Sequence, residues 1–413
     1  MTENTKTSSP NHSGKLKNYF DAIIKKDFGE LVPPESIVTP FGIKTLDTIL
    51  GGGICSSLPV AFSSAPETGK STMAFQFAAN FVKHHEKSVV VYIDVEGASS
   101  VSGNTQFFQD RITTFGIDPD RITYIPSPLD LNGVSELIRS VIRGKRELEE
   151  RTNDSYKLLV VWDSIASTPS SKDATAEDPN EVIGYKAREL SHLISRLKSE
   201  LIMNQVTLVV IDQIRANMKI QSRFQTPDDK GVGEFSNNYK SATNVSAFQH
   251  SVRQWMYMSR GSNITVQDKL GIDGFELHVV MEKNKLAPSK ITIPLVFDKK
   301  FGAIPVLSEY KFISENTKYE KKVFKDAALK KLYPLAVSAS GNSKIISIID
   351  PDSGEVLEST EKFNERHLLK KYFSEPEFKK IFDKAVDLSV QERIINTFFN
   401  RSQLESSNNN DDD

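Results

Sequence analysis

The chain has 413 residues and a formal net charge of −2, with 38% hydrophobic and 26% charged residues. This composition is typical of a soluble folded protein, and it excludes a largely disordered chain and a uniformly basic surface. At roughly 150 residues per domain, the length predicts two or three domains.

Cys55 is the only cysteine, which excludes intramolecular disulfides and cysteine-based zinc sites. No apolar run approaches the ~20 residues that a membrane-spanning helix needs, and residues 1–13 lack the apolar core of a signal peptide. We therefore expect a cytoplasmic protein without a membrane partner.

An apolar face predicts an N-terminal helix over Leu16–Phe28, which ends before Pro33 and Pro34. From residue 41 onward, short apolar runs alternate with amphipathic segments. The predicted helices are Ser71–His84, Leu131–Arg151 and Gly184–Ile202, and the predicted strands are Leu58–Ser63, Ser88–Asp94, Ile122–Ile125, Lys157–Asp163 and Val206–Asp212. Strands that are apolar throughout and alternate with helices predict an α/β fold with a mainly parallel sheet flanked by helices.

The second half of the chain begins with a long polar segment, 216–247, after which strand patterns return at Phe275–Val280 and Lys290–Phe297. Beyond residue 312 the chain is Lys-rich and predicts a smaller C-terminal α+β domain, with helical stretches at Lys318–Leu332 and Lys362–Asn400. The predicted domains are a disordered tail (1–13), an N-terminal oligomerisation arm (14–40), a core (41–312), the C-terminal domain (313–405) and an acidic tail (406–413).

A phosphate-binding loop is predicted between the strand that ends at Ser63 and the following helix. Its candidate residues are Ser64, Ala65, Pro66, Glu67, Thr68, Gly69, Lys70, Ser71 and Thr72. This segment matches the P-loop pattern except that Ser64 replaces the first glycine. Backbone N–H groups would wrap the phosphates, Lys70 would neutralise the β- and γ-oxygens, and the Ser71 hydroxyl would bind Mg²⁺. The alternative is a chance Gly-Lys-Ser at a helix start.

Three other strand ends carry polar side chains that suit the same chemistry. Asp163 ends a buried strand and is placed to hold a magnesium-bound water, although it could instead cap a helix. Glu96 follows another strand and is placed to polarise an attacking water, although it could be a solvated loop carboxylate. Gln213 ends a third strand, where an amide can bind a γ-phosphate or be merely structural.

Three further segments carry a specific resemblance. Phe41–Asp47 together with Leu50–Gly53 resembles the segment before the P-loop in the RecA/RadA/KaiC superfamily. Asp212–Arg215 resembles the Asn-Gln-Ile-Arg signature of RecA recombinases, and Lys283–Lys285 resembles the lysine motif of that family. Over residues 15–310 the chain is most similar to RecA-family recombinases, in particular the UvsX-like recombination proteins of large bacteriophages.

The resemblance implies ATP and Mg²⁺ as cofactors, and it implies a role for each matched residue. Lys70, Ser71 and Asp163 would bind phosphate and magnesium, and Glu96 would activate water. Gln213 would sense the γ-phosphate and couple it to DNA binding. Lys283 and Lys285 would act on the ATP of the neighbouring protomer, although they could instead be two exposed lysines near a strand end. Phe107 or Phe108 would stack on adenine.

Two segments would contact DNA in this family. The first runs from Ser164 to Arg188, with an acidic outer part, and the second is the polar segment 216–247. Basic residues interleaved with an aromatic suit a single-stranded backbone and an inserted base. The candidate DNA-binding residues are Arg188, Arg215, Lys219, Arg223 and Phe224.

The resemblance therefore predicts a DNA-dependent ATPase that forms helical filaments on single-stranded DNA and exchanges strands with double-stranded DNA in recombination, repair and replication. Helix Leu16–Phe28 would be the arm that contacts the neighbouring subunit. A single-stranded-DNA-binding protein and a loading mediator are expected partners, and the host-cell cytoplasm is the expected location of a phage-encoded protein. The alternatives are a ring-forming motor of the same superfamily, such as a replicative helicase or KaiC/RadA-like ATPase, and a degenerate ATP-binding filament protein.

Overall fold

The computed structural model describes residues 18–20, 22, 23, 26, 34–97, 106–172, 185–216, 239–241, 251–265, 272–318, 333–340 and 342–399. The chain divides into two compact units, Met1–Glu35 and Ser36–Asp413. In the first unit, the described residues within the predicted helix Leu16–Phe28 are helical, and the apolar side chains of Tyr19, Phe20 and Ile23 are exposed.

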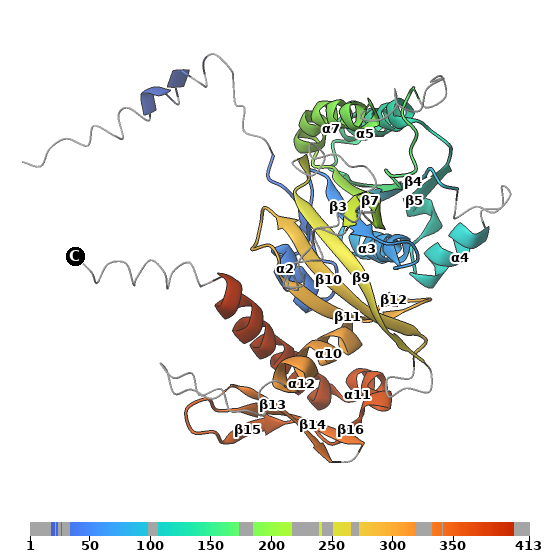
Figure 1. The fold of residues 1–413 in the computed structure, drawn as a ribbon. Coiled ribbons are helices and arrows are strands. Elements are labelled where there is room, and N and C mark those ends of the chain that lie inside the picture. Colours follow the sequence, from blue (N-terminus) through green and yellow to red (C-terminus); the bar gives the residue numbers. More distant parts are fainter. Residues whose placement is uncertain are drawn as a thin grey trace, which may run out of the picture. The chain divides into compact units, whose positions relative to one another are not determined.

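In the part of the chain that the structure describes, the second unit is built on a ten-stranded mixed sheet (Figure 1). Its strands are β3 (Val60–Ser64), β4 (Ser88–Asp94), β5 (Ile122–Pro126), β6 (Lys157–Asp163), β7 (Thr207–Ala216), β8 (Tyr239–Ser241), β9 (Gln254–Ile264), β10 (Gly274–Asn284), β11 (Thr292–Asp298) and β12 (Gly302–Ala303). The order is β12-β11-β10-β9-β3-β7-β6-β4-β5, and β8 pairs with β7. From β9 to β5 all neighbours along this order are parallel, whereas β9 to β12 are antiparallel. The predicted α/β fold with a mainly parallel sheet is confirmed.

Helices cover both faces of this sheet. Successive side chains of each strand point to opposite faces, and because the strands are apolar, both faces are buried under helices. Phe62 and Tyr92 belong to one buried cluster with side chains of α2 (Lys44–Leu50), α3 (Lys70–His84), α4 (Gln106–Thr114) and α10 (Pro305–Lys318). Their strand neighbours Ala61 and Ile93 belong to a second cluster with side chains of α5 (Leu131–Thr152) and α7 (Tyr185–Met203). The predicted helices Ser71–His84, Leu131–Arg151 and Gly184–Ile202 therefore correspond to α3, α5 and α7.

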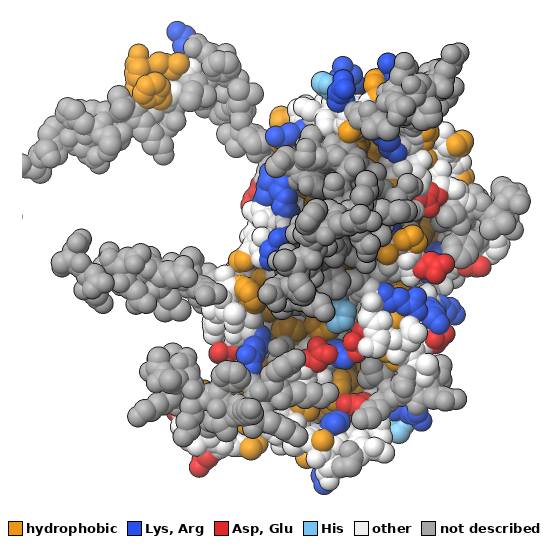
Figure 2. All heavy atoms as spheres, viewed as in Figure 1, with side chains coloured by type: hydrophobic (Ala, Val, Ile, Leu, Met, Phe, Trp, Pro, Cys, Tyr) orange, Lys and Arg blue, Asp and Glu red, His pale blue; other side chains and the backbone are white. Residues whose placement is uncertain are grey.

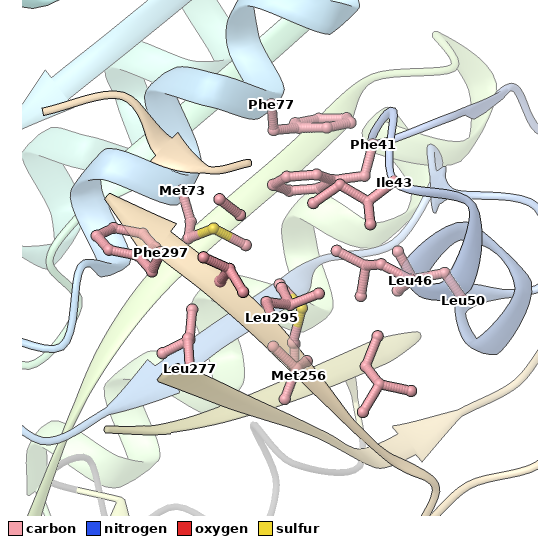
Figure 3. Close-up of a cluster of buried hydrophobic side chains, with 14 of the residues drawn as sticks. Phe41, Ile43, Leu46, Leu50, Met73, Phe77, Met256, Leu277, Leu295 and Phe297 are labelled. Carbon is pink, nitrogen blue, oxygen red and sulfur yellow. The ribbon is translucent and has the colours of Figure 1, made fainter. Parts of the chain in front are cut away.

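The segment that precedes the P-loop is anchored in the first cluster. Figure 3 shows side chains from this segment, from α3 and from the antiparallel strands meeting in one apolar layer. The labelled members are Phe41, Ile43, Leu46, Leu50, Met73, Phe77, Met256, Leu277, Leu295 and Phe297. The layer fixes the start of α3, and with it the P-loop, against strands β9 to β11.

The C-terminal part is α+β, as predicted. Strands β13 (Leu335–Ser340), β14 (Ser343–Ile349), β15 (Val356–Ser359) and β16 (Phe363–Asn364) form a separate antiparallel sheet, next to α11 (Leu368–Ser374), α12 (Pro376–Val390) and η4 (Gln391–Phe399). Their buried residues, among them Ile346 and Phe382, are continuous with the first cluster. The predicted boundary at residue 312 falls inside α10, which contacts both β11 and α12; the domain boundaries stay predictions.

Three details of the predicted elements are wrong. A single helix over Lys362–Asn400 is not formed, because β16 pairs with β14 and Pro376 starts a new helix at a position where its missing N–H is tolerated. The strand predicted from Lys290 begins only at Thr292, since Lys290 has a left-handed φ of 66°. Strand β9 was not predicted, because its second half is polar. The predicted helix Lys318–Leu332 lies outside the described residues except for Lys318, and within the described ranges no helix is long and apolar enough to span a bilayer.

Gln254 ties the segment before β3 to the sheet. Its side chain is fully buried: Oε1 accepts from the Cys55 N–H at 3.0 Å, and Nε2 donates to the carbonyls of Leu50 and Gly53 at 2.8 Å each. Each of these three backbone groups would lose a partner if the amide were removed.

We expect Gln254→Leu to lower the free energy of unfolding by about 3 kcal/mol, because buried polar groups left without partners cost ~1–3 kcal/mol each and partial relaxation offsets the sum. Urea unfolding followed by circular dichroism measures this change. The matched control is Gln391→Leu on the exposed side of η4, for which we expect a change within about 0.5 kcal/mol. Equal effects of the two substitutions would contradict the anchoring role.

Candidate nucleotide-binding and catalytic site

The loop between β3 and α3 has the backbone geometry that phosphate binding needs. Glu67 and Gly69 have left-handed φ values of 57° and 93°, so the chain turns tightly into α3. A Cβ at position 69 would lie 2.4 Å from Cζ of Phe297, so both the φ value and the space require glycine. The first N–H groups of α3 have no partner within the helix and form an anion site.

Lys70 is folded onto its own loop. Its Nζ donates to the carbonyl of Ala65 at 2.8 Å, to the carbonyl of Ser64 at 3.3 Å and to Ser64 Oγ at 3.0 Å. The side chain is buried, which lowers the pKa of Lys70, while the charges of Asp163, Glu96 and Asp212 act in the opposite direction. A phosphate group bound by the loop would be an anionic partner for this ammonium.

Ser64, which stands in place of the usual glycine, causes no backbone strain. It lies at the end of β3 and is not among the described residues with positive φ. Its hydroxyl donates to the Ala65 carbonyl at 2.8 Å and accepts from Lys70. The side chain is therefore accommodated, and it adds one ligand for Lys70.

Asp163 and Ser71, the two residues that the sequence predicts to hold magnesium, are in direct contact. Ser71 Oγ donates to Asp163 Oδ2 at 2.7 Å, and the hydroxyl of Tyr92 donates to the same oxygen at 2.6 Å. Burial is the main cause that raises the pKa of Asp163 to about 6, and the charges of Asp94 and Glu96 add to it. The Tyr92 hydroxyl stays neutral, because burial and the neighbouring carboxylates raise its pKa well above the usual value.

These oxygens fit Mg²⁺. The ion prefers hard oxygen ligands and usually keeps several waters in addition to substrate phosphates. Among the described residues no group of three or more His, Cys, Asp and Glu side chains could hold a metal by itself. Ser71 and Asp163 would thus hold the ion together with the nucleotide, and the ion would supply charge neutralisation at the phosphates.

Glu96 and Gln213 are in direct contact. Gln213 Nε2 donates to Glu96 Oε1 at 2.6 Å, Ser164 Oγ donates to the same oxygen at 2.7 Å, and Ser167 Oγ donates to it as well. Ser64 and Gln213 are register partners in β3 and β7, which places this contact beside the P-loop. The predicted water-activating and phosphate-sensing residues are brought together.

Asp94 has a different role from Glu96, although both follow the core of β4. It is buried, its Oδ1 accepts from the Gly97 N–H at 2.8 Å, and its Oδ2 accepts from the Tyr124 hydroxyl at 2.8 Å. Both carboxylate oxygens are therefore used to shape the loop that carries Glu96.

Lys283 and Lys285 lie at the opposite edge of the sheet. Lys283 is the register partner of Trp255, which is level with Ala61 near the start of β3, whereas the P-loop follows Ser64 at its end. At ~3.3 Å per residue the lysines lie roughly 10 Å back along the strand from the loop. Burial, followed by the neighbouring charge of Lys285, lowers the pKa of Lys283. The lysine pair is not part of the phosphate site of its own chain.

The structure describes only some of the residues that were predicted to contact adenine or DNA. Phe108 is 2% exposed and stacks on Tyr124 with ring centroids 4.0 Å apart, so it is a core residue and its assignment to adenine is wrong. The Phe107 side chain lies outside the described residues, as do Lys219, Arg223, Phe224 and the side chain of Arg215. Arg188 is described and exposed on α7. The described residues on the face in Figure 2 carry both signs of charge.

Several site residues were missed in the sequence. Tyr92 reads there as one more residue of a buried strand, and Ser164 and Ser167 read as polar residues that follow Asp163. Arg111 of α4 donates from Nη1 to Thr72 Oγ1 at 3.3 Å, and burial lowers its pKa. Of these residues, only Tyr92 has a feature in the sequence that could have indicated a role in the site, because it places a hydroxyl group within an otherwise apolar strand.

Asp163→Asn should stabilise the nucleotide-free protein at neutral pH. The folded-state pKa of about 6 lies above the ordinary value of 3.8, so the unfolded chain releases a proton between pH 4 and 6 that the folded protein keeps. The free energy of unfolding therefore falls as the pH rises through this window, and the amide, whose oxygen can accept from Ser71 and Tyr92, avoids the loss. We expect a gain of about 2–3 kcal/mol at pH 7.5 that shrinks toward pH 4.

Urea unfolding of both proteins at pH 4.5 and 7.5 without nucleotide or magnesium measures this difference. Adding Mg²⁺ and ATP should then stabilise the native protein more than the variant. A variant that is less stable at pH 7.5, or a gain that does not depend on pH, would contradict the charge-burial argument.

Comparisons with known proteins agree with this geometry. A family model described as the KaiC ATPase matches residues 39–125, which include the P-loop and Glu96. The RecA protein of Mesomycoplasma hyopneumoniae strain J is 26% identical over 289 residues, which are 67% of this chain and 75% of the relative. The RecA protein of Aquifex pyrophilus is 26% identical over 291 residues, or 68% of this chain and 73% of the relative, and that of Treponema pallidum is 25% identical over 273 residues, or 65% and 58%. The chain thus has the KaiC/RecA-like ATPase fold, and its similarities support a P-loop ATPase of the RecA/KaiC type.

Proposed function

We propose that this protein is an ATP-dependent recombinase that forms helical filaments on single-stranded DNA and exchanges strands with a homologous duplex. The observation that carries the proposal is the hydrogen bond from Gln213 to Glu96. It joins the candidate base to β7, the strand that leads into the candidate DNA-binding segment 216–247. A ligand of that segment can therefore act on ATP hydrolysis through a single side chain.

In this proposal the residues of the site have separate tasks. The α3 N-terminus and Lys70 bind the phosphates, and Ser71 and Asp163 hold Mg²⁺. Glu96 orients the attacking water and accepts its proton, since Asp94 has both oxygens engaged. When ATP binds, Gln213 gives up its hydrogen bond to Glu96 and donates to the γ-phosphate instead. The conformation of the DNA-binding segment is thereby coupled to the bound nucleotide.

The position of the lysine pair supports ATP hydrolysis between protomers. Lys283 and Lys285 are too far back along the sheet to serve their own P-loop, and a neighbouring protomer is the assembly partner that they could serve. A head-to-tail contact that does not close into a ring gives a filament. Arg188, Arg215, Lys219, Arg223 and Phe224 are the proposed DNA contacts.

The finer assignments are part of the same proposal. We place the chain with the UvsX-like recombination proteins of bacteriophages, acting in recombination-dependent replication and repair in the host cytoplasm. A single-stranded-DNA-binding protein and a loading mediator are the proposed partners. The Asp-Gln-Ile-Arg segment at 212–215 supports this choice within the superfamily.

A ring-forming motor is the second candidate, because the matched family model is that of KaiC. Such a ring would use the same phosphate site and would also place a cation of one subunit near the ATP of the next. The two candidates differ in the shape of the assembly on single-stranded DNA.

Glu96→Gln should form stable filaments on single-stranded DNA in the presence of ATP and Mg²⁺. The amide keeps the shape of the carboxylate but cannot accept a proton, so we expect hydrolysis to fall by at least ~10²-fold while ATP stays bound. Negative-stain electron microscopy and a phosphate-release assay measure both effects.

Lys70→Ala is the matched control for this experiment. Loss of the ammonium should abolish hydrolysis and severely weaken ATP binding, and filaments should then be absent. Closed rings in the Glu96→Gln sample would favour the motor. If the native protein forms filaments but exchanges no strands, the remaining hypothesis is a degenerate ATP-binding filament protein.

Replacing both Lys283 and Lys285 by Ala should remove the DNA-stimulated ATPase rate while leaving nucleotide affinity nearly intact. The reason is that their charge would reach only the ATP of a stacked neighbour, as an arginine finger does. The double substitution of Lys299 and Lys300, which are exposed after β11, is the matched control and should keep the rate.

Mixing the Lys283/Lys285 variant with Lys70→Ala tests the action between protomers directly. Some interfaces of the mixed filament would combine an intact P-loop with an intact lysine pair, so partial activity should return. A mixture that co-assembles but stays as inactive as its components would refute the assignment.

A further inference from the structure

Glu96 is held by side chains from two different parts of the chain. Ser164 and Ser167 follow β6, and Gln213 lies in β7. All three donate to the same oxygen, Oε1, and no hydrogen bond from a described residue is made to Oε2. The contact therefore distinguishes the two oxygens of one carboxylate.

The chemistry of a carboxylate makes this distinction important. Each oxygen has about two lone-pair sites, so any two of the three donors already fill the accepting capacity of Oε1. An oxygen in that state has no site left for the proton of a water molecule. As long as the three contacts persist, Glu96 can accept a proton only at Oε2.

The two serines form one unit. Ser164 is fully buried, and its Oγ lies 3.0 Å from Ser167 Oγ and accepts from the Ser167 N–H at 3.3 Å. The single Ser164 proton can go to Glu96 Oε1 or to Ser167 Oγ, and the Ser167 proton goes to Glu96 Oε1. Ser167 is exposed, so its hydroxyl is not needed to fill the core.

We propose that Ser164 and Ser167 are positioning residues that fix the carboxylate of Glu96 so that Oε2 is the oxygen available to the attacking water. The inference rests on the proposed role of Glu96 as the base. It adds to Gln213 a second link to the base, from the start of segment 164–188. A change in the conformation of either segment alters the donors on Oε1.

Ser167→Ala tests the inference, because the exposed residue can be changed without loss of packing. We expect kcat for ATP hydrolysis to fall about tenfold, the scale of one hydrogen bond to a charged group, while KM for ATP changes less than about twofold. Ser167→Thr keeps the hydroxyl and should restore most of the rate. The melting temperature should be the same in all three proteins.

Ser155→Ala is the matched control. Ser155 is exposed just before β6, its hydroxyl accepts from Lys157 Nζ at 3.3 Å and it makes no contact with Glu96, so we expect unchanged kcat. The decisive measurement repeats Ser167→Ala in the Glu96→Gln background under single-turnover conditions. If Ser167 acts through Glu96, the second substitution should cause no further loss.

The outcomes separate this inference from the proposed function. Native kcat in Ser167→Ala, with Glu96→Gln inactive, would overturn the positioning role and leave the base assignment intact. Equal losses from Ser167→Ala in both backgrounds would also overturn it, because the serine would then act elsewhere. Normal hydrolysis by Glu96→Gln would overturn the base assignment itself, and the inference with it.

Discussion

The buried carboxylate of Asp163 is the interaction on which the rest of the site depends. It receives hydrogen bonds from Ser71 of α3 and Tyr92 of β4, so one side chain joins the P-loop helix to two strands. Burial disfavours its charge, which is why its pKa rises to about 6. The protein bears this cost in the absence of a ligand, and a bound cation would offset it. The site is therefore less stable when empty than an apolar strand end would be.

The strand order decides which other groups meet Asp163. β7, β6 and β4 are adjacent and parallel, so their carboxyl ends lie at one edge of the sheet. Glu96 follows β4, Ser164 follows β6, and Gln213 lies in β7 opposite Ser64. Polar side chains placed after three separate apolar runs thus converge without any long-range motif in the sequence.

Much of this arrangement could be predicted, and the limits have physical causes. β4 and β6 were predicted with their observed ends because both faces of these strands are buried and their sequences are apolar until an aspartate stops them. The hydroxyl of Tyr92 could not be assigned, since its contact with Asp163 depends on which strand lies beside β4. β9 was missed because only its first half alternates buried residues with partly buried ones, whereas its second half is polar. Ser64 departs from the glycine of the P-loop pattern, but a residue at this strand end needs no positive φ.

The two edges of the sheet constrain how protomers would pack in the filament that we propose. Asn284, between the two lysines, donates to the Ile49 carbonyl and accepts from the Leu286 N–H at 2.8 Å each, which fixes the end of β10 against α2. The lysines are therefore held at the edge of the sheet opposite to the phosphate site. No rotation of these side chains alone brings them to the P-loop of the same chain. If the lysine pair does serve a phosphate, as we propose, the contact has to join opposite edges of two protomers. Such a contact uses different surfaces on its two sides, and its repetition leads to an open helical assembly unless the rotation happens to close it.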